Sequence, residues 1–198
     1  MTTRVEMLKG FPRNLTVCEA GTRKCVYAEY MISKEWLDPE HLYLMDINTN
    51  SEVENFINNY DNTTFLLGTF SDRVKDLPKI DMVYIDGLHS YSNVSRDLRD
   101  FDPITTRWLA GHDWVNEGDI FQNHIQNDAF EVREAVTDWL KDKDYYLTYV
   151  TDDISNPKHD PDANWPYASA RPLRSWVVSK TKEDHDLFLH NLEQYNND

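Results

Sequence analysis

The stretch "IDMVYIDGLHSYSNVSRDLRDF", residues 80–101, joins an apolar run, a polar turn and a helical pattern. Its first part holds four consecutive apolar or aromatic residues, Met82 to Ile85, as a buried strand does. Apolar residues then recur at the spacing of one helix face up to Phe101. The stretch therefore predicts a strand that ends at Asp86, followed by a helix over residues 90–101.

The same alternation of strand and helix patterns continues along the chain. Apolar runs predict strands over residues 15–20, 41–47, 64–68, 80–86, 108–113, 145–150 and 175–180. Amphipathic patterns predict helices over residues 23–37, 51–60, 71–77, 90–101, 131–142 and 181–195. Ser51 and Glu54 have the spacing of a capping box at the start of the second helix. Alternating strands and helices predict a doubly wound parallel α/β sheet, and the last two strands predict an antiparallel pair.

The length of the chain, 198 residues, is suited to one domain with a sizeable core. We expect a single domain over residues 1–198, with its core at about 15–180 and a C-terminal helix over 181–195. Two long segments without a clear element, 114–130 and 151–174, are expected to be lids over a site.

The composition limits the partners and the compartment. The 35 acidic residues outnumber the 20 Lys and Arg and give a net charge of -15, which argues against nucleic acid and anionic membranes. No apolar run is long enough to span a membrane, and the N-terminus lacks the apolar centre of a signal peptide. We therefore expect a cytoplasmic protein in which Cys18 and Cys25 are buried thiols. A homo-oligomer is compatible with the sequence, which does not define the oligomeric state.

Polar residues follow five of the predicted strands, where ligands bind in open α/β sheets. These residues are Glu19 to Thr22, Asp46, Gly68 to Ser71, Asp86, and His112 with Asp113. Glu19, which precedes the turn at Gly21, suits a cationic or amino-bearing ligand, although an ordinary βα turn is an equal interpretation. Asp46 is placed either to accept hydrogen bonds from ribose hydroxyls or to cap the next helix.

The sharpest group of candidate residues is Asp86, His89, His112 and Asp113. If the strands over 80–86 and 108–113 are neighbours, their carboxylates and an imidazole would meet at one point. Such a set suits Mg²⁺, Mn²⁺ or Fe²⁺, and a metal there could orient an acceptor hydroxyl while a histidine takes its proton. Alternatively, Asp86 contacts only a cofactor, Asp113 caps a turn and the histidines make local hydrogen bonds.

Five motifs together resemble a known family. They are "VCEAGT", "LYLMDIN", "IDMVYIDGLHSYSNVSRDLRDFDP", "LAGHDW" and "VREAVTDWL". Over residues 15–180 their order and spacing are similar to class I S-adenosylmethionine-dependent methyltransferases, above all to the small-molecule O-methyltransferases of the cephalosporin-hydroxylase and macrocin type. The resemblance implies a Rossmann-like, mostly parallel seven-stranded sheet with an antiparallel C-terminal hairpin. It also implies methyl transfer to a small hydroxylated acceptor.

The resemblance further assigns roles to residues. S-adenosylmethionine would be bound by Glu19, Ala20, Gly21, Thr22, Asp46, Thr69, Phe70, Ser71 and Asp86, with Asp46 on the ribose. A divalent metal, Mg²⁺ or Mn²⁺, would be bound by Asp86, His112 and Asp113, and His89 and His112 are the catalytic candidates. The chain departs from the family at Cys25, where a second glycine is usual, and at His112, where an acid is more frequent.

Two other functions remain open. The missing second glycine favours a non-catalytic protein that binds a cofactor or partner on a methyltransferase scaffold. The cluster of His89, His112, Asp86 and Asp113 would also suit a metal-dependent hydrolase or oxygenase. A nicotinamide-dependent oxidoreductase ranks last, because the G-x-G-x-x-G fingerprint is absent.

Overall fold

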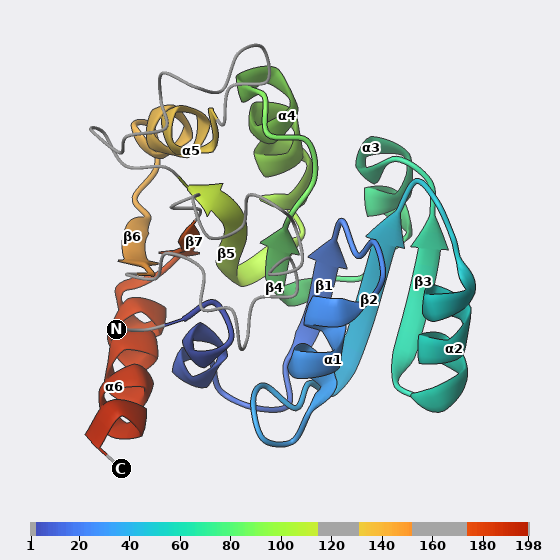
Figure 1. Ribbon diagram of the computed structural model, residues 1–198. Helices are drawn as coiled ribbons and strands as arrows, with labels where there is room; N and C mark the ends of the chain where they lie inside the picture. Colours follow the sequence, from blue (N-terminus) through green and yellow to red (C-terminus); the bar gives the residue numbers. More distant parts are fainter. Residues whose placement is uncertain (1–2, 115–130, 152–173, 198) are drawn as a thin grey trace, which may run out of the picture.

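A computed structural model describes residues 3–114, 131–151 and 174–197 (Figure 1). The strands are β1 (Thr16–Ala20), β2 (His41–Asp46), β3 (Thr63–Leu67), β4 (Ile80–Ile85), β5 (Thr105–Trp114), β6 (Tyr146–Val150) and β7 (Arg174–Ser179). The helices are α1 (Val26–Ile32), α2 (Ser51–Asn59), α3 (Phe70–Arg73), α4 (Tyr91–Phe101), α5 (Val132–Leu140) and α6 (Lys182–Asn197). Two 3₁₀ helices, η1 (Glu6–Gly10) and η2 (Val74–Asp76), complete the described elements. Among these elements, no helix is long and apolar enough to cross a membrane.

The seven strands form one sheet in the order β3-β2-β1-β4-β5-β7-β6. Strands β1 to β5 are parallel, and β7 runs antiparallel to both β5 and β6. This arrangement confirms the predicted fold class, including the antiparallel C-terminal pair. The strand order reverses between β1 and β4, where Ala20 is paired with Ile85. The residues that follow β1, β2, β4 and β5 therefore meet at one edge of the sheet.

Helices cover both faces of the sheet, so that alternate side chains of each strand enter different cores (Figure 1). In β4, Met82 and Tyr84 pack in the core that also contains residues of α1, α2 and α6. Val83 and Ile85 pack in the core that contains residues of α4 and α5. The residue after Ile85 consequently continues on the side of Tyr84, which places Asp86 toward α1 and the N-terminal segment.

The N-terminal segment packs against the C-terminal helix, which the sequence analysis did not predict. The ring of Phe11 lies 4.8 Å from that of Phe188 in an edge-to-face contact. The side-chain amide of Asn191 donates a hydrogen bond to the carbonyl of Gly10 at 3.2 Å. A Cβ atom on Gly10 would lie 2.4 Å from the Phe188 ring, so the close approach of η1 to α6 requires glycine.

Several predicted helix ends differ from the structure, among them both ends of α1 and the cap of α2. The first helix begins at Val26 and not at residue 23, because Cys25 adopts a left-handed conformation (φ 61°) that helical residues do not have. It ends at Ile32, since Ser33 is extended. The cap of α2 is Asn50 and not Ser51: the Asn50 side chain accepts a hydrogen bond from the Val53 amide at 2.9 Å.

The remaining expectations concern the segments and the thiols. The predicted lids over 114–130 and 151–174 lie, apart from their end residues, outside the described parts of the chain. Cys18 and Cys25 are free, buried thiols, as expected. Burial is the main cause that raises the pKa of the Cys25 thiol to about 12, which excludes a thiolate there near neutral pH.

Candidate active site

The turn after β1 lies against the ends of two other strands. Gly21 has a φ of 103°, and a Cβ atom on it would come within 2.0 Å of the Asp86 carbonyl oxygen. Its amide donates a hydrogen bond to the carbonyl of Met45 at 2.8 Å. Glycine is therefore required both by the conformation and by the lack of space. Main-chain atoms of Gly21 are therefore not covered by a side chain at the point where the strand order reverses.

Glu19 is buried beneath this turn, with 1 % of its surface exposed. Its carboxyl group accepts a hydrogen bond from the Thr22 hydroxyl. Burial raises the pKa of Glu19 to about 8, although the Thr22 hydrogen bond and the charge of Arg4 act in the opposite direction. A cationic ligand beside Glu19 would favour the ionised carboxylate and would therefore be attracted to it. Ala20 is fully buried in the core below.

Asp46 fastens the turn after β1 to the end of β2. One of its carboxylate oxygens accepts a hydrogen bond from the Arg23 amide at 2.8 Å. The other accepts one from the Asn48 amide at 3.0 Å. The side chain of Asn50 adds a hydrogen bond to the Arg23 carbonyl at 2.8 Å. Both oxygens of Asp46 thus already contact backbone, and any ribose contact would use their remaining lone pairs.

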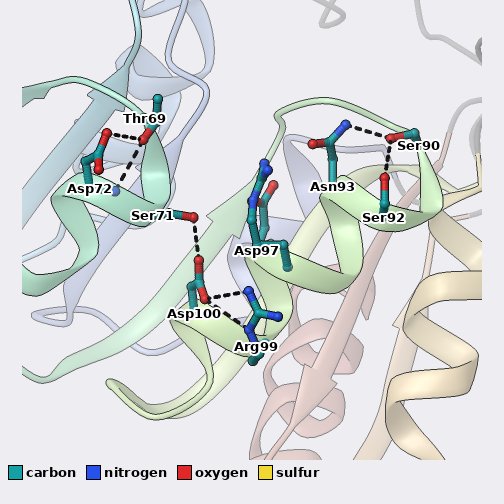
Figure 2. A network of polar contacts seen from close by, with 10 residues as sticks. Thr69, Ser71, Asp72, Ser90, Ser92, Asn93, Asp97, Arg99 and Asp100 are labelled. Carbon is teal, nitrogen blue, oxygen red and sulfur yellow. Dashed lines mark hydrogen bonds and ion pairs between the residues drawn. The ribbon is translucent and has the colours of Figure 1, made fainter.

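The segment after β3 is tied to α4 (Figure 2). The Ser71 hydroxyl donates a hydrogen bond to Asp100 at 2.6 Å. Thr69 caps α3, and its hydroxyl donates to Asp72 at 2.7 Å. The Phe70 ring lies 6.0 Å from that of Phe101, edge to face. The hydroxyl groups of Thr69 and Ser71 therefore donate hydrogen bonds to protein carboxylates. The segment lies beside the carboxyl ends of the parallel strands.

The candidate metal ligands and proton acceptors lie at the carboxyl ends of β4 and β5. Among the described residues, ligand atoms of Asp86, His89 and Asp113 lie within 4.8 Å of one another. His89 Nε2 is 2.6 Å from one oxygen of Asp113, and His112 Nδ1 is 3.3 Å from the other. The neighbouring strands β4 and β5 thus bring the predicted residues together, but the compact triad contains His89 where His112 was predicted.

An irregularity in β5 explains how adjacent residues share this site. The pairing of β5 with β7 is regular up to Gly111, shifts, and resumes at Trp114. Within the shift, Asp113 has a positive φ of 62°. Successive side chains of a regular strand point to opposite faces, whereas this break lets His112 contact the side chain of Asp113. The Trp176 indole donates a hydrogen bond to the His112 carbonyl at 3.3 Å and supports the break.

Asp113 is buried, and burial alone would raise the pKa of its carboxyl group. The imidazoles of His112 and His89 outweigh this effect and hold the pKa well below its usual value. Asp113 is therefore a fixed negative charge between two histidines. This arrangement can orient an imidazole and stabilise its protonated form.

Contacts from the start of α5 hold the loop that carries His89. The Glu131 amide donates a hydrogen bond to the His89 carbonyl at 3.0 Å. The Glu131 side chain in turn accepts one from the Tyr91 amide at 2.7 Å. The Tyr91 hydroxyl donates to Asp138 at 3.0 Å. The sequence analysis missed Glu131 and Tyr91, because their pairing joins segments 40 residues apart.

Arg4 is a further residue of the site that the sequence did not reveal. Its guanidinium Nη2 lies 2.5 Å from Asp86 Oδ2, and its side chain is 11 % exposed. A single arginine ahead of the first strand has no pattern that would mark it. Its position depends on the packing of the N-terminal segment described above.

A glycine turn and acidic residues at the reversal of strand order are the features expected of an S-adenosylmethionine-dependent methyltransferase, the class that the motifs resemble. Residues 19–114 match the family described as a methyltransferase domain. This match, over just under half of the chain, supports the predicted enzyme class. No curated protein matches the chain.

Solved structures share the fold. An rRNA methylase from Streptococcus thermophilus is 10% identical, with a TM-score of 0.58 over 89% of this chain and 93% of that one. A precorrin-6y C5,15-methyltransferase from Geobacter metallireducens is 11% identical, with a TM-score of 0.56 over 88% and 84%. Aeropyrum pernix fibrillarin with natively bound S-adenosyl-L-methionine is 13% identical, with a TM-score of 0.58 over 88% and 72%. Because one neighbour is an rRNA methylase, the comparisons do not support the expected exclusion of nucleic acid.

Proposed function

We propose that the protein transfers a methyl group from S-adenosylmethionine to a hydroxyl oxygen of a small molecule. The observation that supports this reaction best is the His89–Asp113 pair, at 2.6 Å, beside Asp86 and the Gly21 turn. One part of the edge can hold the methyl donor, and the adjoining part can accept a proton. Methylation of a hydroxyl group requires both.

The residues at the ends of β1, β2 and β3 fit the cofactor chemically. The Gly21 turn lets a ligand approach the backbone, and the buried Glu19 favours a positively charged one. When bound, S-adenosylmethionine supplies a methyl group on a cationic sulfonium. Its methionine part would lie against Glu19 to Thr22, its ribose against Asp46 and its adenine beside Thr69 to Ser71. Asp86 would contact it from the end of β4.

The histidines would receive the proton of the acceptor hydroxyl. The side chain of His89 is 34 % exposed, whereas that of Asp113 behind it is 5 % exposed. The Asp113 carboxylate orients the His89 ring and stabilises the imidazolium that forms. His112, on the other oxygen of Asp113, would act as a second proton acceptor.

Asp86, His89 and Asp113 also offer a chemically suitable ligand set for a divalent cation, with two carboxylates and one imidazole. Mg²⁺ or Mn²⁺ bound there would orient the acceptor hydroxyl and lower its pKa. In this form of the proposal His89 is a ligand, and His112 takes the proton. The metal dependence of activity separates the two forms.

Two observations bear on the competing functions. Cys25 adopts the left-handed conformation that a glycine would have, and its amide donates a hydrogen bond to the Thr22 carbonyl at 2.8 Å. Cys25 thus holds a closed, hydrogen-bonded turn without the second glycine, which favours a working cofactor site over a degenerate scaffold. The net charge of -15 favours a small acceptor over RNA, since RNA phosphates would be repelled.

Calorimetric titration with S-adenosylmethionine and S-adenosylhomocysteine, with and without Mg²⁺ or Mn²⁺, tests the cofactor assignment. We expect both to bind, and absence of binding under every condition would overturn the proposal. Release of S-adenosylhomocysteine is then measured with phenols, catechols and glycosides, and with tRNA and rRNA. Turnover with RNA alone would contradict the small-molecule acceptor, and EDTA tests the need for a metal.

A further inference from the structure

We infer that Arg4 binds the α-carboxylate of the methionine part of S-adenosylmethionine and selects for cofactors that have this group. The inference rests on the proposed function, and it assigns a specificity residue within the same site.

Arg4 lies at the edge where the cofactor would bind. Its Nη2 atom is 2.5 Å from Asp86, the first residue after β4, and it is one of the charges that act on the buried Glu19. Its Nε atom is buried and has no hydrogen-bond partner among the described residues. A buried N–H group of a guanidinium is costly to leave without a partner. A ligand carboxylate would satisfy it.

The guanidinium is fixed in place. Its central carbon lies 4.2 Å from the ring centre of Tyr27 and 5.1 Å from that of Tyr84, so two aromatic rings hold it. The Tyr27 hydroxyl donates a hydrogen bond to the Arg4 carbonyl at 3.0 Å, which also fixes the backbone. An arginine that is oriented before the ligand arrives loses little conformational entropy on binding.

The charges of the edge explain why a cation is needed here. Glu19 and Asp86 suit the positive groups of the cofactor, the sulfonium and the α-ammonium. The Asp86 carboxylate would repel the α-carboxylate of the cofactor unless a cation lay beside it, as Arg4 does. Arg23 and Lys24, in the nearby turn, are exposed, so that water weakens their attraction for an anion. The Arg4 side chain is mostly buried, so water weakens its attraction for an anion much less.

The test compares ligands that differ in one group. The affinities of S-adenosylmethionine, decarboxylated S-adenosylmethionine and 5′-methylthioadenosine are measured by calorimetry for the wild type, Arg4→Met and Arg4→Lys. The wild type should prefer the carboxylate-bearing ligand by roughly 10- to 100-fold. In Arg4→Met this preference should fall to about onefold, while the affinity for 5′-methylthioadenosine, which lacks the amino-acid part, stays within about twofold.

The control is Arg13→Met, because Arg13 is 57 % exposed and its ion pair with Asp38 is 3.9 Å long. This variant should keep the wild-type preference. If Arg4→Met does not fold, Arg4→Lys keeps the charge without the planar fork and should show a reduced preference. An unchanged preference in the Arg4 variants would overturn the assignment. Tighter binding of both S-adenosylmethionine and its decarboxylated form to Arg4→Met would also overturn it. A wild type that binds none of the ligands would instead overturn the proposed function itself.

Discussion

The two parts of the edge are built in different ways. At the ends of β1 and β2 the backbone forms the surface. The space at Gly21 admits no side chain, and the Asp46 carboxylate accepts hydrogen bonds from backbone amides. At the ends of β4 and β5 side chains form it, with Asp113 between His89 and His112. A substitution in the first part should therefore act through folding and cofactor binding. In the second part it should act mainly through the chemical step.

The largest expected effect is that of Asp113→Asn on turnover. Asparagine tolerates the left-handed conformation of residue 113 and keeps the shape of the side chain, but it removes the charge between the histidines. We expect kcat to fall by roughly 100- to 10,000-fold, with S-adenosylmethionine affinity within about threefold of the wild type. Transfer assays with the best acceptor and calorimetry measure the two quantities. A normal kcat would show that the side-chain half has no part in the chemistry.

Gly21→Ala should reverse this pattern. The new Cβ atom would meet the Asp86 carbonyl at 2.0 Å in a conformation that alanine rarely adopts, so the turn must move. We expect a loss of about 2 kcal/mol or more in the free energy of unfolding, together with the loss of cofactor binding. Urea denaturation and calorimetry test this, with Lys24→Ala in the same turn as the control. Wild-type stability and affinity in Gly21→Ala would contradict the steric argument.

Glu19→Gln should make stability less dependent on pH. Burial raises the pKa of Glu19 from 4.5 to about 8, with Thr22 and Arg4 opposing and Asp86 and Asp46 assisting. A carboxyl group with a raised pKa stabilises the fold fully below pH 4.5 and loses this contribution as the pH rises through about 8. The variant should therefore gain stability relative to the wild type between pH 5 and pH 8.5, by about 1 kcal/mol or more. An equal difference at both values in urea denaturation would refute the raised pKa.

The smallest expected effect is that of Ser71→Ala. Its hydroxyl binds Asp100 at the surface, and we expect a loss of less than about 1 kcal/mol in the free energy of unfolding. Because this donor is already used within the protein, cofactor affinity should change by less than about threefold. A larger loss of affinity in calorimetry would mean that the Ser71 hydroxyl leaves Asp100 to contact the cofactor. Ser92→Ala, on the exposed start of α4, is the matched control.

Much of this architecture could be predicted, because parallel strands deliver the residues that follow them to one edge. The order of strand and helix patterns and the polar residues after β1, β2, β4 and β5 were sufficient for that. The sequence placed His89 and His112 in one candidate group with Asp86 and Asp113, but it did not show which histidine lies in the compact triad. The choice between the histidines depends on the break in β5. Aspartate does not require a positive φ, so the sequence at Asp113 does not predict this break. The caps and helix ends differed for similarly local reasons, as Asn50 shows.

Arg4 escaped prediction for a different reason, which has a consequence for the order of folding. During synthesis the N-terminal segment leaves the ribosome before any strand of the sheet, whereas its packing partner α6 follows all of them. The contacts of Phe11 with Phe188 and of Gly10 with Asn191 can form only then. Contacts between such distant segments close late and slowly. A nascent chain can thus assemble the β1–β4 edge, with the partners Tyr27, Tyr84 and Asp86 of Arg4, before the packing of η1 against the last helix becomes possible.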